Sequence, residues 1–245
     1  KSGEFVTNTG TKKRRFRRVE SKITAKGARA IFYRQFLEYK KEKYFIFTKM
    51  TVLSAVVAFI FAYSLQKSVS DSSMAGFILL GVVAYVALIM SGYTGKWESE
   101  LKNPYIFLIP DSPLKKMWYA TLMEHVKAFA DGCIICIPIG IFWHVPVIEI
   151  IYCILIYTVL QADRLYTMVI VQSLLGEVFG KTGQSLLRMF IQMALLGVGA
   201  GVGVLAAVLI SQTLIFPIVL IYGLMITVAM GAIALLRFDT MEQFV

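Results

Sequence analysis

Residues 74–93 read MAGFILLGVVAYVALIMSGY, a stretch of twenty residues without a charged side chain. At about 1.5 Å of rise per residue, a helix of this length is about as long as the hydrocarbon core of a bilayer is thick. Residues 45–65, FIFTKMTVLSAVVAFIFAYSL, form a second apolar stretch just upstream. The polar residues 66–73 separate the two, so the sequence predicts two membrane-spanning helices joined by a short turn.

Similar apolar stretches recur along the rest of the chain. We expect further spans at about 120–143, 146–175, 186–210 and 214–236, which gives about six in all. Hydrophobic residues make up 58% of the 245 residues, and the mean hydropathy is +0.70. This is more apolar than a soluble core of that size requires. The sequence therefore predicts an all-α fold, a polytopic membrane helix bundle over residues 45–245.

The net positive charge is concentrated at the beginning of the chain. Residues 1–44 contain 14 Lys and Arg against 4 Asp and Glu, whereas the remaining residues contain 11 of each sign. The flanks 1–44, 94–117, 177–188 and 237–245 carry 14, 4, 2 and 1 Lys or Arg, and the opposite turns carry only Lys67. Because Lys and Arg resist translocation, we expect a multi-pass protein of the plasma membrane with both termini in the cytoplasm.

The run KKRRFRR at 12–18 is the most basic part of this opening segment. Such a run could bind nucleic acid, but beside membrane spans its commoner partners are anionic lipid headgroups. We therefore expect residues 1–44 to form a cytoplasmic linker that contacts the bilayer surface and binds no nucleic acid. The apolar run comes too late for a secretory signal. The chain starts at Lys1 rather than Met, which suggests a fragment or a processed chain.

The end of the linker has the pattern of an amphipathic helix. Apolar residues recur there at helical spacing, among basic residues that supply the polar side. The apolar set is Ala28, Ile31, Phe32, Phe36 and Tyr39, and the basic set is Lys26, Arg29, Arg34, Lys40, Lys41 and Lys43. We expect this N-terminal helix to lie in the inner membrane interface. It would act as an anchor for the first span or as a lever between the bundle and a cytoplasmic motor.

The longest inside loop, residues 95–117, reads GKWESELKNPYIFLIPDSPLKKM. Its prolines predict a short helix containing Trp97 and Glu98, then a turn, then an interfacial stretch at 105–109. Charged groups around apolar anchors suit a docking surface for a soluble partner. The alternative is a re-entrant or interfacial loop that only covers the bundle.

Two groups of charged residues fall within the predicted spans. Glu124, Lys127 and Asp131 recur at spacings of three and four, on one helical face. They would form either the polar wall of a conduit or a ladder of ion pairs near the cytoplasmic boundary. Asp163 and Arg164 lie in a long fourth span, where charged residues mark either a substrate path or a structural ion pair. Together these five residues are the candidates for a translocation path.

Four glycines in the fifth span, Gly197, Gly199, Gly201 and Gly203, form two overlapping Gly-xxx-Gly pairs. Such pairs allow another backbone to approach closely, either a neighbouring helix or a second subunit. Their spacing does not fit a nucleotide-binding loop, and the chain has no Walker loop. Its three cysteines lie in apolar segments, and two histidines offer no convincing metal set. We therefore expect no enzyme activity, cofactor or metal in this chain, and any ATP-driven work must come from another polypeptide.

Two segments resemble a known family. ESELKNPYIFLIPDSPLKKMWYATLMEH at 98–125 and AKGARAIFYRQFLEYKKEKYFIF at 25–47 are similar to permeases of the "Putative ABC exporter" family of Gram-positive bacteria. The resemblance extends from the amphipathic segment to the end of the chain. Family members are longer, so this chain looks like a carboxy-terminal membrane half, with a second permease half or a homo-oligomer as its partner.

The resemblance also implies a division of work. The chain would be the membrane-spanning permease subunit of an ATP-driven exporter, with ATP and Mg bound by a separate cytoplasmic ABC ATPase subunit. In related permeases the loop after the second span docks into the ATPase, which makes Glu98, Glu100, Asn103 and Tyr105 the coupling surface here. The amphipathic helix would be the matching connector.

Two other classes of function stay open at this stage. A non-transporting membrane scaffold that recruits proteins or anionic lipid would explain the basic linker, although it would leave the long inside loop unexplained. A polytopic membrane enzyme would need convergent His, Asp or Glu near one membrane face, and few such residues are present.

Overall fold

The computed structural model describes residues 25–41, 45, 47, 49–66, 72–92, 96–101, 105–175 and 180–243. The described part contains no strand, which confirms the all-α prediction. Its helices are α1 (Arg29–Lys41), α2 (Lys49–Ser64), α3 (Ser72–Ser91), α4 (Lys96–Leu101), α5 (Tyr105–Leu108), α6 (Pro113–Phe142), α7 (Val147–Leu175), α8 (Gly180–Leu209) and α9 (Ile215–Gln243). A short 3-10 turn, Gln212–Leu214, precedes α9.

Five of these helices, α3, α6, α7, α8 and α9, are long and apolar enough to cross a membrane, by length and composition. The sixth predicted span, at 45–65, corresponds to the shorter helix α2, whose apolar part is Thr51–Ser64. Sixteen helical residues reach roughly 24 Å, less than the hydrocarbon thickness of about 30 Å. The predicted count of six is thus approximate: five full-length helices and one shorter apolar helix.

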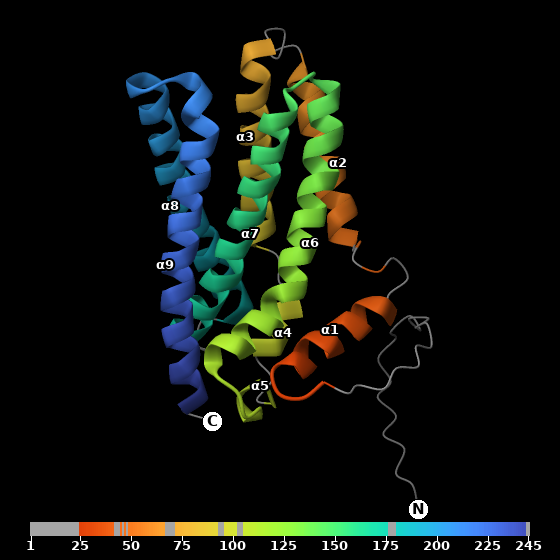
Figure 1. Ribbon diagram of the computed structural model, residues 1–245, viewed down its shortest axis with the longest axis vertical. Helices are drawn as coiled ribbons and strands as arrows, with labels where there is room; N and C mark the ends of the chain where they lie inside the picture. Colours follow the sequence, from red (N-terminus) through yellow and green to blue (C-terminus); the bar gives the residue numbers. More distant parts are fainter. Residues whose placement is uncertain are drawn as a thin grey trace, which may run out of the picture.

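The long helices run side by side, and the short ones gather at one end of the bundle (Figure 1). Helices α1, α4 and α5 lie there together with the end of α9. The end of α2, the start of α3 and the turns that join α6 to α7 and α8 to α9 lie at the opposite end. We call the end at which the short helices gather the α4 end. The described parts of the basic flanks, from which we predicted the cytoplasmic side, lie at this end.

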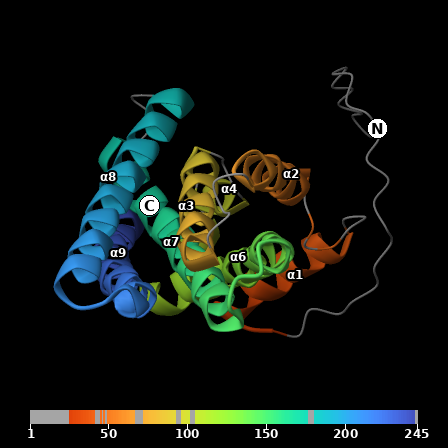
Figure 2. The same cartoon turned by 90° about the horizontal axis from the view of Figure 1, so that it is seen from above.

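Helix α7 occupies the middle of the bundle and contacts α3, α6, α8 and α9. Viewed along the bundle, α8 and α9 lie on one side of it and α6 and α2 on the other (Figure 2). One buried apolar cluster joins α2, α3, α6 and α7, and a second, built around Trp97, Ile106 and Leu165, lies at the α4 end. Many large apolar side chains of α8 and α9 are exposed, as expected of helices that face lipid.

The predicted amphipathic helix is present as α1, and it packs against α6. Its buried side consists of Ile31, Gln35 and Tyr39. Phe36 is half-buried and stacks on Phe32. The buried stripe therefore contains a polar residue, Gln35, that the apolar spacing did not indicate. Of the predicted polar side, Lys43 lies outside the described residues, as do residues 1–24 of the linker.

Candidate functional site

Helix α4 is only six residues long, KWESEL, yet its side chains reach several different helices. Trp97 is completely buried, and its indole Nε1 donates a hydrogen bond to the Leu165 carbonyl of α7 at 3.3 Å. Burial of a whole indole ring, together with a partner for its N–H group, is a favourable arrangement for tryptophan. This side chain fixes α4 against the central helix of the bundle.

Glu98 joins α4 to α8. Its Oε2 accepts a hydrogen bond from Nη1 of Arg188 at 3.1 Å, and the two side chains are only 8% and 2% exposed. Nearby, the Ser185 hydroxyl of α8 donates to the Gly92 carbonyl just after α3 at 3.0 Å. The sequence analysis singled out neither Arg188 nor Ser185. The available signal was an arginine close to a predicted span, which requires a buried acidic partner.

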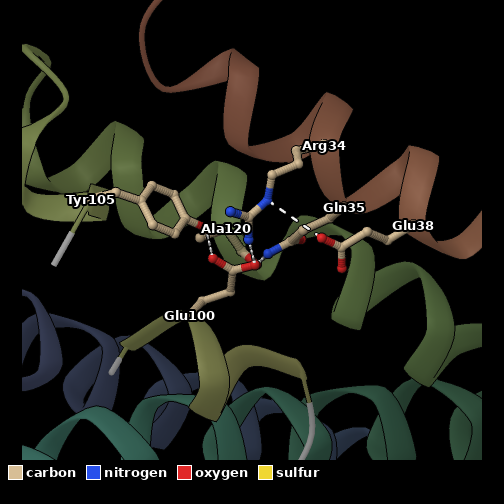
Figure 3. A network of polar contacts seen from close by, with 6 residues as sticks. All are labelled: Arg34, Gln35, Glu38, Glu100, Tyr105 and Ala120. Atoms are coloured by element: carbon tan, nitrogen blue, oxygen red, sulfur yellow. Dashed lines mark hydrogen bonds and ion pairs between the residues drawn. The ribbon is translucent and has the colours of Figure 1, made fainter. Parts of the chain in front are cut away.

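Glu100 joins α4 to α1 and α5 (Figure 3). Its carboxylate accepts hydrogen bonds from the Arg34 guanidinium and the Tyr105 hydroxyl. Arg34 also lies over the Tyr105 ring, 4.4 Å from its centroid, and within 3.5 Å of Glu38. Burial raises the pKa of Glu100 above its ordinary value, and the Arg34 charge opposes that shift.

Three further contacts tie α1 to its neighbours along its length. Gln35 donates its Nε2 to the Ala120 carbonyl of α6 at 3.0 Å (Figure 3). The Tyr39 hydroxyl donates to Oε1 of Glu124, also on α6, at 3.1 Å. The Lys96 ammonium of α4 lies over the ring of the same tyrosine, 3.7 Å from the ring centroid. Helix α1 thus touches both the short helix α4 and the charged face of α6.

The start of α1 is held by Asp111, just before α6. Its Oδ2 accepts from the Ala28 backbone N–H at 3.1 Å, and its Oδ1 accepts from the Ser112 N–H at 2.9 Å. These backbone bonds lower the pKa of Asp111 below its ordinary value. Gly27 has a φ of +64°, and a Cβ there would lie 2.8 Å from the Asp111 carboxylate. A side chain at Gly27 would therefore be strained and crowded.

The structure places the expected coupling residues inward rather than on the surface. Glu98 and Glu100 are buried and paired within the chain, and Tyr105 is half-buried. Asn103 lies outside the described residues. The exposed part of the loop comes later: Leu108 is 72% exposed, and Leu114 and Lys115 are exposed as well. Burying two carboxylates costs free energy unless cations pair with them, and Arg188 and Arg34 supply that pairing.

The charged residues of α6 face α7 in a small polar cluster. Glu124, Lys127 and Asp131 line a cavity of about 20 Å³ together with Gln161 and Arg164 of α7. Nη1 of Arg164 donates to the Met90 carbonyl of α3 at 3.1 Å. Asp131 interacts electrostatically with both Lys127 and Arg164. The structure therefore brings four of the five candidate path residues together, with balanced charges.

Asp163, the fifth candidate, lies apart from this cluster. Its side chain is 1% exposed and lines a chamber of about 480 Å³ between α3, α7, α8 and α9. Asp163 and Arg164 form no ion pair with each other, because the helix directs neighbouring side chains about 100° apart. The pairing of these two residues with one another, which the sequence left open, does not occur in this structure.

The four glycines of α8 divide into two pairs. A Cβ at Gly199 would lie 3.1 Å from the Tyr222 ring of α9, and one at Gly203 would lie 3.3 Å from Val219. A Cβ at Gly197 or Gly201 would meet nothing within 4 Å. One Gly-xxx-Gly pair thus packs against the neighbouring helix, and the other faces outward.

None of the described residues form a group of three or more His, Cys, Asp or Glu that could hold a metal ion. The α4 end instead connects several helices of the bundle to one another. A single short helix is bonded through Trp97 to α7, through Glu98 to α8, and through Glu100 to α1.

No curated protein and no solved structure matches the chain. A family model described as "Putative ABC exporter" matches residues 1–242, nearly the whole length. This match agrees with the resemblance seen at 25–47 and 98–125, and with a bundle of apolar helices long enough to cross a membrane. The chain therefore belongs to the "Putative ABC exporter" family and is a membrane component of a transporter.

Proposed function

We propose that this chain is the permease subunit of an ATP-driven exporter and that the segment 96–115 couples it to a separate cytoplasmic ATPase. The family implies an ATPase partner. The observation that carries the proposal is the bonding of α4, whose side chains reach α1, α7 and α8 at once. A segment bonded in this way can pass a displacement on to several helices of the bundle.

Within this proposal the buried carboxylates transmit motion, and other residues make the contact. Leu108 and Leu114 are exposed large apolar side chains beside the basic Lys115, at the corner between α5 and α6. Such a corner suits insertion into a groove of a partner protein. Glu98 and Glu100 then hold the corner to the bundle, which retains them as coupling residues in a different role.

The mechanism that we propose alternates the bundle between two states that differ in access to the two sides of the membrane. ATP binding by the partner subunits draws the docked segments together, and the bundle shifts between two access states. The shift requires contacts that differ between these states. The Glu98–Arg188 pair and the Trp97–Leu165 bond are candidates, because each joins α4 to a different membrane helix.

The experiment is co-purification from membranes of a partner ABC ATPase, recognised by its Walker loop, followed by measurement of ATPase stimulation. Leu108→Asp should abolish co-purification, since it places a charge in the contact. Glu98→Gln should preserve co-purification but weaken stimulation. Lys41→Gln, at an exposed position at the end of α1, serves as a control that changes neither. Stimulation that survives both substitutions would overturn the coupling proposal.

The orientation is part of the same proposal. The basic flanks gather at the α4 end, and positive flanks stay in the cytoplasm. Both termini then lie inside, and the basic residues 1–44 contact anionic headgroups. A fluorescent protein fused to the C-terminus should fold and fluoresce, whereas alkaline phosphatase inserted at residues 211–213 should be active. The opposite pattern would reverse the topology and remove the 96–115 segment from reach of an ATPase.

A further inference from the structure

The chamber between α3, α7, α8 and α9 has a volume of about 480 Å³. This lies within the range of roughly 300–1,000 Å³ typical of small-molecule sites. Its walls are mainly aliphatic and aromatic side chains and glycines, including Gly81 of α3, Gly199 of α8 and Gly223 of α9. Among the described residues that line it, Asp163 is the one carboxyl group.

Asp163 has an unsatisfied acceptor in this apolar setting. Its side chain is 1% exposed, and its Oδ1 has no hydrogen-bond partner. An ionised carboxylate in apolar surroundings is costly unless a cation pairs with it. An unpaired carboxylate does not stabilise the bundle. No Lys, Arg or His is among the described residues that line the chamber, so Asp163 has no cationic partner there.

The neighbouring groups cannot supply that partner. Thr227 lies within hydrogen-bonding reach of Asp163, but its hydroxyl has one hydrogen, which the Gly223 carbonyl accepts at 2.9 Å. The Tyr222 hydroxyl likewise donates to the Leu195 carbonyl at 3.2 Å. Arg164, next in sequence, donates to Met90 on the other side of α7. Oδ1 is thus left without a donor among the described residues, and a molecule that enters the chamber can supply one.

We infer that this chamber binds an organic cation, a molecule with one positive charge on a bulky apolar body. The apolar walls would bury the body while Asp163 pairs with the charge. A metal ion would need about six oxygen ligands, whereas the polar groups lining the chamber besides Asp163 are Gln212 and Tyr222. The Tyr222 ring can also contribute a cation–π contact.

Access to the chamber fits an amphiphilic ligand. Gly81 on α3 and Val204 on α8 both line it and are exposed. The chamber therefore opens on a side of the bundle that a bilayer would cover. Apolar cations concentrate in the bilayer and could enter laterally. The inference rests on the proposed function, since it names the class of substrate that the permease would move.

The test uses the purified full chain in lipid nanodiscs and needs no ATPase. Labelled tetraphenylphosphonium is the probe, empty nanodiscs measure its partition into lipid, and triphenylphosphine oxide is a neutral competitor of similar shape. Saturable binding that excess unlabelled cation displaces and the neutral compound does not is expected. Absence of saturable binding beyond that of empty nanodiscs, or equal displacement by the neutral compound, would overturn the inference. Either result would leave the ATPase-coupling tests, and with them the proposed function, unaffected.

Four variants locate the site. Asp163→Asn should weaken the cation affinity about tenfold or more, a modest figure for removing one partner of a buried charge pair, and Asp163→Glu should retain most of it. Gly81→Phe should abolish binding. A Cβ at this position would meet nothing within 4 Å, so the new ring can be accommodated and would occupy the space of the ligand. Glu149→Gln, which changes a carboxyl group of α7 that does not line the chamber, should bind normally. Unchanged binding by both Asp163→Asn and Gly81→Phe would place the probe elsewhere and refute the inference.

Discussion

Arg188 and Glu98 form an ion pair across 3.1 Å, with both side chains almost completely buried. They are ninety positions apart in the chain, and the pair is the direct charge link between α4 and α8. Because neither charge is solvated, each depends on the other for its stability in the folded state. The pair therefore serves as a structural tie whose loss affects the whole α4 end.

Truncation of either partner should destabilise the protein strongly. Arg188→Ala removes a buried cation from beside the Glu98 carboxylate and should lower the free energy of unfolding by up to about 3–5 kcal/mol. Thermal unfolding in detergent measures this. The double variant Glu98→Leu with Arg188→Met should recover most of the loss, and Lys115→Ala, at an exposed pair, should cost less than about 1 kcal/mol. A small effect of Arg188→Ala would mean that the pair is solvated in the membrane.

Glu100 should make stability fall as the pH rises. Its pKa is raised in the folded state, mainly by burial, so the folded protein binds a proton more tightly than the unfolded chain does. Its contribution is present below the ordinary glutamate value of 4.5 and is lost as the pH rises through the raised pKa. Glu100→Gln should flatten this slope when unfolding is followed from pH 4.5 upward. The control Glu38→Gln should keep most of the slope, since burial, the largest cause of the raised pKa of Glu100, is unchanged and the Glu38 charge adds less. An equal slope in Glu100→Gln would assign the pH dependence to another group.

Gly27→Ala should loosen α1 selectively. The residue has a φ of +64°, and the new methyl group would lie 2.8 Å from Asp111 Oδ2. We expect a local cost of about 1–2 kcal/mol, read as faster hydrogen exchange in α1. Gly180→Ala is the matched control, because its φ is +60° but no atom lies within 4 Å of the added Cβ. If exchange in α1 stays unchanged, the Asp111 contact does not anchor the helix.

The glycines of α8 should tolerate substitution unequally. Gly199→Leu would push into the Tyr222 ring of α9 and should cost about 1–3 kcal/mol. Gly201→Leu meets open space and should leave the melting temperature of the monomer nearly unchanged. The two variants are compared by thermal unfolding together with the oligomeric state. A large loss in Gly201→Leu, with a change of oligomeric state, would show that the outward pair faces a second subunit.

The spans could be predicted from the sequence because an apolar run of sufficient length has few alternatives to a helix in or near a membrane. Helix α6 nevertheless starts earlier than the predicted 120, at Pro113, because an extended Ser112 and a proline in the first turn begin it there. The short helix with Trp97 and Glu98 was also predicted, since prolines bound the loop. Composition could not show that α2 is shorter than the other spans.

The partners of the buried charges could not be predicted. Glu98 binds a residue of α8, and Glu100 binds a residue of α1. Both contacts depend on how the helices pack, for which one sequence contains no direct signal. Asp163 and Arg164 illustrate the same limit, because their positions in a span were evident while the neighbours on each side of α7 were not. The exposure of Leu108, at the corner that we propose as the contact, could not be predicted for the same reason.

Helix α4 has a practical consequence as a reporter of assembly. Its six described residues are bonded through Trp97 to α7, through Glu98 to α8 and through Glu100 to α1. Amides in a segment packed in this way exchange slowly only while those contacts hold. Slow amide exchange at residues 96–101 would show that the bundle has assembled correctly. A label at this site would report assembly in a purified sample before any transport assay is run.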